Sequence, residues 1–388
     1  MVATRKKIDR RAFGSCWPAP DQIALLRACC LEGSAALEAW TEWKAHPAAI
    51  GWENLDLGSC RLLPLLYRNL SRLGPPPDEI SPLKKHYRLA WAANRLLLAK
   101  FRPILAALEA EKIPLMILKG AALSPLYYRD EGARPMSDID FLFHPQQAPQ
   151  AFAVLRKLGW QPVHRHMPAV VEITHSYTFK NEAGEEIDPH WHALHECCRA
   201  HDDDSFWEAS RPLALEGFTV RAMCPADQLL HVCSHGLRWN RTPPLRWVAD
   251  AVMILHAAGP ELAWDRLLSQ AADRRLNRAV FSALLYLREI LHVPLPESVL
   301  ETLKKTPLSL LEKKEFRWKT HPPGWWGPLP VEACLWFRLT RGQSLARQLA
   351  GLPRYFRLLH NFPNYRKLLR YTFFLLWKHL QRKAGPKP

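Results

Sequence analysis

The sequence contains no stretch that approaches the roughly 18 uncharged apolar residues of a membrane-spanning helix. Its first residues, MVATRKKIDRRAF, are basic but lead into no apolar segment, so we expect no signal peptide. The nine cysteines form no C-x-x-C pair, and a chain of 388 residues can bury a core without disulfides. We therefore expect a cytoplasmic protein with reduced thiols and no transmembrane segment.

Acidic residues are scarce relative to basic ones, with 37 Asp and Glu against 53 Lys and Arg and a formal net charge of +16. This surplus favours an anionic partner: a nucleotide, a nucleic acid or an anionic membrane surface. Charge alone does not choose among them. The hydrophobic content of 48% is typical of globular proteins, and the length allows two or three units with their own cores.

One stretch, IPLMILKGAALSPLYYRDEGARPMSDIDFLF from Ile113 onward, carries most of the candidate chemistry. A short apolar run over 114–118 breaks at Lys119 and Gly120, and a helix is predicted over 121–128. A glycine at such a turn allows a phosphate to approach the backbone closely, and a helix start offers free N–H groups. These features suit phosphate binding at the turn.

A second apolar run begins with Asp138 and Asp140. In a strand, residues two apart point to the same face, so the two carboxylates are predicted to lie side by side. Paired carboxylates of this kind hold a divalent cation such as Mg2+ against substrate phosphates. The run therefore predicts a metal site at the start of a strand.

The pattern Lys119-Gly120-Ala121, then Arg134, then Ser137-Asp138-Ile139-Asp140 resembles the nucleotidyltransferase superfamily related to DNA polymerase beta. More narrowly, it is similar to the uncharacterised bacterial nucleotidyltransferases, over roughly residues 22–291. The resemblance implies an α+β fold with a small mixed β-sheet, flanked by N-terminal and C-terminal helical regions. Its core is a strand, a turn and helix, a DxD strand, and a later strand with a third carboxylate. The usual Gly-Ser turn is replaced here by Gly120-Ala121, which removes one hydroxyl contact to phosphate.

The same resemblance implies three catalytic, metal-binding carboxylates: Asp138, Asp140 and Asp188, the last in EEIDPHWH. They are expected to bind Mg2+ or Mn2+, with an NTP as substrate, and Asp188 is expected to serve the acceptor side and assist as a general base. A turn residue beside Pro189 is the alternative for Asp188.

Five residues are expected to contact the nucleotide and its phosphates, where negative charge develops. An exposed turn lysine and a capping serine are the structural alternatives for two of them. The five are Lys119, Gly120, Ala121, Arg134 and Ser137.

Histidines and cysteines gather immediately downstream, at His190, His192, His195, Cys197, Cys198 and His201. Imidazole and thiolate are the preferred ligands of zinc, but the spacings match no standard finger or ribbon. We favour His190 and His192 as residues that line the mouth of the active site or contact the nucleotide. Farther on, His231 and His235 lie four apart on a predicted helix, but Val232 replaces the glutamate of the HExxH metalloprotease signature.

Periodicity predicts helices over 21–31 with Asp21 as N-cap, 60–73, and 82–111, the last kinked or split by Pro103. A helix over 145–158 and a hairpin of 170–180 with 185–191 follow, and the second half is predicted to be helical, over 225–235, 245–257, 264–272 and 277–291. Residues 352–383 interleave Lys and Arg with aromatic residues, which suits anionic lipid, nucleic acid, or a terminal helix packed on the protein.

We divide the chain into an N-terminal helical region (1–98), the nucleotidyltransferase core (99–195), a helical bundle that closes the cleft (196–293) and a basic, aromatic C-terminal region (294–388). The expected activity is metal-dependent transfer of a nucleoside monophosphate to an acceptor hydroxyl or amine. The acceptor is RNA, a protein or peptide, or a small molecule. A catalytically silent nucleotide- or nucleic-acid-binding module and a toxin-like tRNA nucleotidyltransferase are the alternatives.

Overall fold

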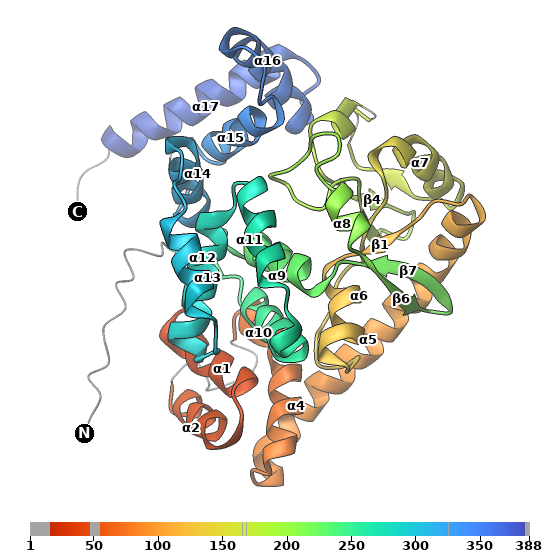
Figure 1. The fold of residues 1–388 in the computed structure, drawn as a ribbon. Helices are drawn as coiled ribbons and strands as arrows, with labels where there is room; N and C mark the ends of the chain where they lie inside the picture. The colour runs from red at the N-terminus through yellow and green to blue at the C-terminus, as the bar shows by residue number, and fades with distance from the viewer. Residues whose placement is uncertain (1–15, 47–54, 165, 168, 325, 385–388) are drawn as a thin grey trace.

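The computed structural model describes residues 16–46, 55–164, 166–167, 169–324 and 326–384, so the basic N-terminal segment lies outside the described residues. The α+β class is confirmed: a seven-stranded mixed sheet lies between helices (Figure 1). Among the helices of the described ranges, none has the length and apolar character needed to span a bilayer. The sheet runs in the order β3-β4-β5-β2-β1-β7-β6, with strands β1 Met116–Ile117, β2 Asp140–Leu142, β3 Gln161–Pro162, β4 Phe179–Lys180, β5 Glu186–His190, β6 Arg211–Leu215 and β7 Phe218–Ala222.

The centre of the sheet is buried on both faces. Ile117, Phe141 and Phe143 belong to one hydrophobic cluster, which contains the C-terminal half of α5 (Pro77–Ala110) and α7 (Ala148–Lys157). Met116 and Leu142 alternate with them and belong to a second cluster, which contains the helical bundle. Residues of β2 with the same parity as Leu142 therefore face the bundle.

Helix α5 is continuous through Pro103, so of the two expected outcomes, a kink or a split, the split is wrong. Phe101, Ile104 and Leu108 are buried on both sides of the proline and pack on the sheet. Packing along this face holds the helix together, although proline removes one backbone hydrogen bond. The boundary proposed between residues 98 and 99 falls inside this helix.

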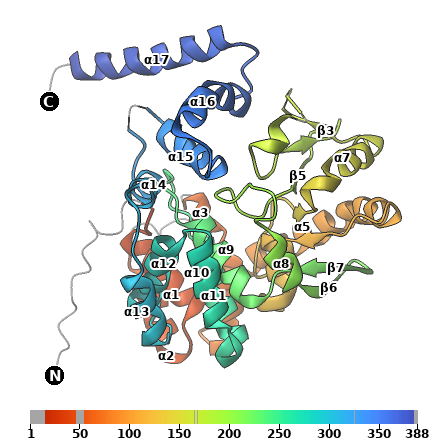
Figure 2. The same ribbon diagram turned by 45° about the horizontal axis from the view of Figure 1, so that its top comes forward.

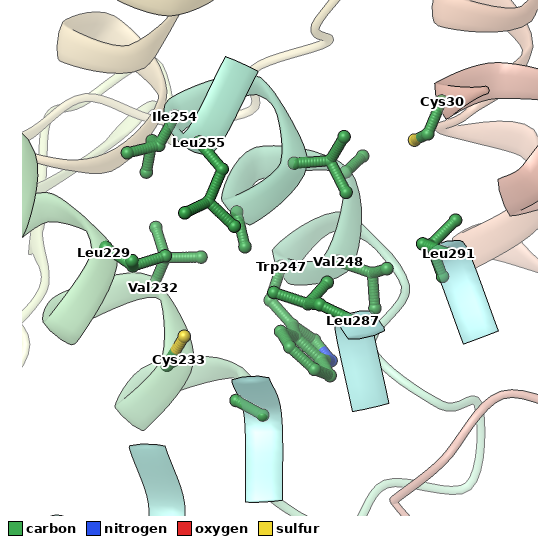
Figure 3. Packing of buried hydrophobic residues seen from close by; sticks show 14 of the residues in the cluster. Cys30, Leu229, Val232, Cys233, Trp247, Val248, Ile254, Leu255, Leu287 and Leu291 are labelled. Atoms are coloured by element: carbon green, nitrogen blue, oxygen red, sulfur yellow. The ribbon is translucent and has the colours of Figure 1, made fainter. Parts of the chain in front are cut away.

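The bundle is formed by segments that lie far apart in the sequence (Figures 1 and 2). Leu229 and Val232 of α9, Trp247 of α10 and Leu287 of α12 point toward a shared interior (Figure 3). A Cβ at Gly236, at the end of α9, would lie 2.1 Å from Trp247 Cγ, so glycine permits this close approach. The N-terminal helices and the later ones thus share one core. The helices are α1 Pro20–Cys30, α2 Gly33–Lys44, α3 Leu57–Cys60, α4 Leu63–Leu73, α9 Pro225–Gly236, α10 Arg246–Ala258, α11 Trp264–Asp273, α12 Asn277–Leu291, α13 Glu297–Lys305 and α14 Leu310–Thr320.

Several local predictions need correction. Asp21 is not the N-cap of α1, because the cap is Ala19, whose N–H is bonded by the Gln22 side chain. The start of the predicted strand 170–180 is a 3-10 helix, Ala169–Glu172, in which Val170 packs into the core. The predicted hairpin is present as the antiparallel pair β4 and β5. The β6–β7 hairpin lies in a region predicted to be helical, and its turn places Glu216 and Gly217 at positive φ.

The C-terminal region consists of α15 (Leu329–Leu339), α16 (Leu345–Leu359) and α17 (Tyr365–Ala384). Tyr355 and Leu358 of α16 join the cluster on the α5 side of the sheet, and His164 bonds the Leu358 carbonyl oxygen at 2.7 Å. Helix α17 packs on α16 at the edge of the molecule (Figures 1 and 2). The four-part division of the chain stays a prediction.

Candidate active site

The register of two neighbouring strands brings two of the predicted carboxylates together. β2 and β5 run parallel, with Asp140 directly opposite Asp188 and Leu142 opposite His190. Because alternate residues share a face, Asp140, Asp188 and His190 all lie on the side of the sheet that faces the bundle. An aspartate pair about 50 residues apart in sequence thus becomes a side-by-side pair.

Lys119 and His190 converge on this pair. Lys119 Nζ donates a hydrogen bond to Asp140 Oδ1 at 2.5 Å, and His190 Nε2 lies 3.1 Å from the same oxygen. His190 Nε2 is also 3.3 Å from Asp188 Oδ2. Among the described residues, Asp140, Asp188 and His190 are the one group of three potential metal ligands whose donor atoms lie within 4.8 Å of one another.

The charges of this group are strongly coupled. Burial would raise the pKa of Asp140, but the hydrogen bond from His190 and the charge of Lys119 hold it well below its usual range. Burial would lower the pKa of His190, but its bonds to Asp140 and Asp188 outweigh burial and raise it. Asp140 therefore stays ionised and attracts positive charge, as a carboxylate of a cation site does.

Asp138 does not lie on the strand as predicted, because β2 begins only at Asp140. Its side chain is exposed and accepts a hydrogen bond from Ser137 Oγ at 3.2 Å. Desolvation by its neighbours, together with the charge of Asp140, raises the pKa of Asp138. Asp138 thus lies close enough to feel the Asp140 charge, but outside the close group with Asp188 and His190.

The predicted phosphate-binding turn has a different local structure from the one expected. Lys119 adopts a positive φ of 46° and begins the short helix α6 (Lys119–Leu123), which continues as a π-helix, Ser124–Tyr128. A Cβ at Gly120 would lie only 2.4 Å from Arg134 Nη1, so glycine allows the arginine side chain to lie against this turn. Ala121 is buried in the core on the α5 side.

Arg134 forms a buried ion pair that the sequence did not reveal. Its Nε and Nη2 donate to the two carboxylate oxygens of Asp250 on α10, at 2.7 and 2.8 Å. The Tyr128 hydroxyl donates to the same Asp250 at 2.7 Å. Burial would lower the pKa of Arg134, but Asp250 outweighs it and raises that pKa. The pair joins the DxD loop to the bundle, and the predicted phosphate contact of Arg134 stays a prediction.

A cleft of about 510 Å³ lies between this turn and the bundle. Asp250, already paired, is the acidic residue of its lining, and the Nε2 atom of His231 on α9 is buried with no hydrogen-bond partner among the described residues. The basic residues of the lining are Lys119, Arg134, Arg61, Arg238, Arg241 and Arg246.

The arginines of this cleft repel one another. Burial and the nearby charges of Arg134 and Arg61 lower the pKa of Arg246 to about 10, although Asp250 opposes this. Arg246 Nη1 donates to the Pro135 carbonyl oxygen at 3.1 Å, which fixes the side chain next to the DxD loop. Among the described residues, Arg61, Arg241 and Arg246 of this lining form no ion pair, and such positive charge favours an anionic ligand in the cleft.

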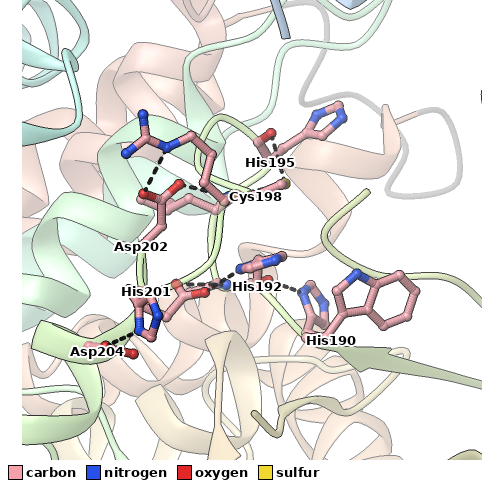
Figure 4. A network of polar contacts seen from close by, with 12 residues as sticks. His190, His192, His195, Cys198, His201, Asp202 and Asp204 are labelled. Atoms are coloured by element: carbon pink, nitrogen blue, oxygen red, sulfur yellow. Dashed lines mark hydrogen bonds and ion pairs between the residues drawn. The ribbon is translucent and has the colours of Figure 1, made fainter. Parts of the chain in front are cut away.

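The downstream histidine group separates into different environments (Figure 4). His192 does not line the site mouth, because it is buried and paired with Asp203, with Nδ1 2.7 Å from Oδ2. His201 pairs with Asp204 at the surface, at 2.8 Å. Burial raises the pKa of the Cys198 thiol, whose Sγ donates to the His195 carbonyl oxygen at 3.4 Å. Of the predicted mouth residues, His190 is the one that contacts the carboxylates.

Sequence reasoning missed part of the surroundings of Lys119. His175, His195, His231 and His235 line a small cavity with Lys119 and His190. The i, i+4 spacing of His231 and His235 was a usable signal for a shared helix face. His175 lies in a loop, and its approach to His195, with ring centroids 4.6 Å apart, has no signal in the sequence.

Comparison with known proteins gives a family match and weak structural similarities. The model of a family described as uncharacterised nucleotidyltransferase matches residues 59–292. Among solved structures, the antibiotic-resistance factor ANT(2'')-Ia is 15% identical, with 48% of this chain and 96% of that chain covered and a TM-score of 0.34. The lincosamide antibiotic adenylyltransferase LnuA, bound to lincomycin, is 17% identical, with coverages of 39% and 91% and a TM-score of 0.28. A nucleotidyltransferase-like protein from Paracoccidioides brasiliensis is 15% identical, with coverages of 56% and 94% and a TM-score of 0.32. No curated protein matches the chain.

Proposed function

Because the chain belongs to the uncharacterised nucleotidyltransferase family, we propose that it transfers a nucleoside monophosphate from an NTP to an acceptor hydroxyl or amine. The observation that carries this proposal is the placement of Asp140 opposite Asp188, next to a cleft lined by arginines. Lys119 belongs to both places, since it bonds Asp140 and borders the cleft. Carboxylates that can bind a metal ion lie on one side, and basic residues that can bind phosphate lie on the other. This arrangement suits a metal–nucleotide substrate.

Asp138, Asp140 and Asp188 are the residues that would hold Mg2+ or Mn2+. The donor set fits: Asp140 and Asp188 offer carboxylate oxygens at close range, Asp138 lies near enough to feel the Asp140 charge, and hard cations prefer such oxygen ligands. When bound, such cations lower the pKa of the acceptor and neutralise charge on the triphosphate. Lys119 supplies positive charge to Asp140 from the protein itself, and His190 contacts both Asp140 and Asp188.

The nucleotide is proposed to occupy the cleft. Its volume lies within the range of small-molecule sites, and guanidinium groups bind phosphate oxygens through two parallel hydrogen bonds. Arg61, Arg241 and Arg246 have guanidinium groups in the lining without a carboxylate partner among the described residues. Lys119 is placed to exchange Asp140 for a phosphate oxygen, and His231 Nε2 offers a further polar contact.

Arg134 has a positioning role in this proposal, and Asp188 has a role on the acceptor side. Arg134 holds Asp250 and so fixes the DxD loop against α10, while its Nη1 faces the turn at Gly120. Asp188 is the less buried member of the aspartate pair, with a side chain 26% exposed. An acceptor group that enters from solvent therefore reaches Asp188 before Asp140, which suits the proposed role of Asp188 on the acceptor side.

The direct test is to incubate the purified protein with each α-32P-labelled NTP, Mg2+ or Mn2+ and a cell extract. Wild type is expected to label an extract component, and Asp138→Asn/Asp140→Asn is expected to leave it unlabelled. Asp202→Asn/Asp204→Asn is the matched control, since it removes two carboxylates with the same spacing from the turn that leads into α8 (Asp204–Glu208), away from the candidate site. Sensitivity of the label to RNase or protease separates RNA, protein and small-molecule acceptors.

Absence of transfer with all four nucleotides, together with binding of the Mg2+–nucleotide, would instead indicate a catalytically silent binding module. Labelling of tRNA, with growth arrest on expression that Asp140→Ala relieves, would indicate a toxin-like enzyme. Absence of both transfer and nucleotide binding by the folded protein would contradict the proposal.

A further inference from the structure

We infer that helix α17 is a docking surface for membranes that contain anionic lipid. The first observation is the distribution of charge. After Glu332 the sequence contains twelve Lys and Arg residues and no Asp or Glu, whereas the whole chain has a formal net charge of +16. Most of the surplus positive charge therefore lies in the last 56 residues. Basic residues at a surface attract the negative potential of anionic lipid headgroups.

The second observation is an apolar stripe along α17. Leu369, Phe373 and Trp377 are 57%, 66% and 57% exposed, and they follow one another at intervals of four residues. Residues four apart lie on one face of a helix, and Tyr365 extends the same row by one turn. Single exposed apolar residues are ordinary on protein surfaces, but a row of them along one helix marks an interaction site.

Leu369, Phe373 and Trp377 do not lie on the face by which the helix joins the protein, whereas Tyr365 at the start of the row contacts α16, with its ring centroid 5.3 Å from the guanidinium carbon of Arg357. Leu368 is buried, and the Tyr371 ring lies 5.5 Å from both His360 and Phe362. These contacts hold α17 on α16 through residues on the opposite side of the helix from Leu369, Phe373 and Trp377. Figures 1 and 2 show the helix at the edge of the molecule. The stripe thus points away from its own supporting contacts.

The basic residues lie next to the stripe. Arg366 and Arg370 each follow a stripe residue by one position, and both are exposed, as is Lys367. A helix with an apolar row beside a basic row lies in the interface of a membrane, with its apolar side chains among the acyl chains and its charges at the headgroups. Trp and Tyr at the ends of the row suit the same interface, because their rings are apolar with one polar group.

The aliphatic members of the row favour lipid over nucleic acid. Leu376, which is 40% exposed, follows Phe373 by three residues and so extends the row on the same face of the helix. Bases stack on flat aromatic or guanidinium planes, so Leu369 and Leu376 would contribute little to RNA binding. Insertion into lipid gains from every apolar side chain alike. The surface therefore fits an anionic bilayer better than a nucleic acid, and its binding requires neither nucleotide nor metal.

The test is flotation of the full-length protein with phosphatidylcholine vesicles, with and without phosphatidylglycerol, at low and at high salt. We expect binding that is about tenfold or more stronger with phosphatidylglycerol and that weakens in high salt. Leu369→Ser/Phe373→Ser/Trp377→Ser is expected to lower binding about tenfold or more, and Arg366→Glu/Lys367→Glu/Arg370→Glu is expected to abolish the preference for anionic vesicles.

Leu89→Ser/Trp91→Ser/Leu96→Ser is the matched control, since these side chains of α5 are 59%, 48% and 57% exposed, and its binding should equal that of wild type. Three results would overturn the inference. The first is equal flotation with neutral and anionic vesicles, or none with either. The second is binding to poly(U) RNA that competes with vesicles and is unaffected by the serine variant. The third is a dimer that the serine variant dissociates. None of these readouts depends on nucleotidyl transfer.

Discussion

The two walls of the candidate active site are built in different ways. The acidic wall lies on strands, where the register of β2 and β5 fixes Asp140 beside Asp188. The basic wall comes from helix ends and a connecting segment: Arg61 follows α3, Arg241 lies between α9 and α10, and Arg246 begins α10. Strand register positions reacting groups precisely, whereas loop side chains adapt to a ligand. The acidic wall should therefore govern the rate of transfer, and the basic wall should govern nucleotide affinity.

The largest effect is expected from the acidic wall. Asp140→Asn should lower the rate of nucleotidyl transfer by about four orders of magnitude, because it removes a charge that organises the metal and Lys119. The measurement is the initial rate at saturating nucleotide, with circular dichroism to check folding. A loss in Asp202→Asn/Asp204→Asn as large as in Asp140→Asn would show that the effect is not specific to this wall.

The next largest effect is expected from the ion pair between Arg134 of the DxD loop and Asp250 of α10. Asp250→Leu should lower the free energy of unfolding by about 3–5 kcal/mol, because it leaves the buried Arg134 without its partner. Urea denaturation measures this. The double variant Arg134→Met/Asp250→Leu should recover most of the loss, since no unpaired charge then remains. A double variant no more stable than Asp250→Leu would contradict this account of the pair.

The pH dependence of the free energy of unfolding tests the buried His231 of the cleft lining. Burial lowers the pKa of His231 to about 3 from its ordinary 6.5, so the folded protein keeps it neutral. The unfolded chain takes up a proton as the pH falls below 6.5, and folding stability is lost in that direction. Between pH 7 and pH 5 the loss from this residue should be roughly 2 kcal/mol.

His231→Asn isolates this contribution, because an asparagine amide can keep a donor near the position of Nδ1 while removing the titration. Its unfolding free energy, measured by urea denaturation at both pH values, should fall by roughly 2 kcal/mol less than that of wild type. Equal pH dependence in the two proteins would show that His231 is protonated in the folded state or exposed.

The smallest effect is expected from a single residue of the basic wall. Arg241→Gln should raise the dissociation constant of the Mg2+–NTP complex about tenfold, the value of one charged hydrogen bond, and leave the maximal rate nearly unchanged. Isothermal titration calorimetry and steady-state kinetics measure the two quantities. Arg156→Gln on α7 is the control. A drop in maximal rate with unchanged affinity would remove the distinction between the walls.

The sequence was most informative where local rules decide the structure. Helices α10, α11 and α12 begin and end within a residue or two of their predicted limits, because apolar periodicity and terminal residues define them. The prediction that Asp188 returns beside the DxD strand is confirmed by the pairing of β5 with β2. The Glu216-Gly217 pair is a turn signal for the β6–β7 hairpin, but the predicted helical region did not take it into account.

The sequence was least informative where distant segments meet. The pairing of Arg134 with Asp250 joins residues 116 positions apart and has no local pattern. The same holds for His192 and Asp203, whose pairing removes a histidine from the predicted mouth. Strand length also mattered, since β2 starts two residues after Asp138 and leaves that carboxylate in a loop. Tertiary packing decided each of these cases.

The central claim is that the residues of the acidic wall catalyse transfer of the α-phosphoryl group, together with its nucleoside, to the acceptor. The most direct test compares α-32P- and γ-32P-labelled forms of the preferred NTP in the same transfer reaction, with wild type and Asp140→Asn. We predict that wild type passes only the α-label to the acceptor and releases the γ-label as pyrophosphate, and that Asp140→Asn does neither. Transfer of the γ-label to the acceptor, or equal transfer by both proteins, would contradict the account.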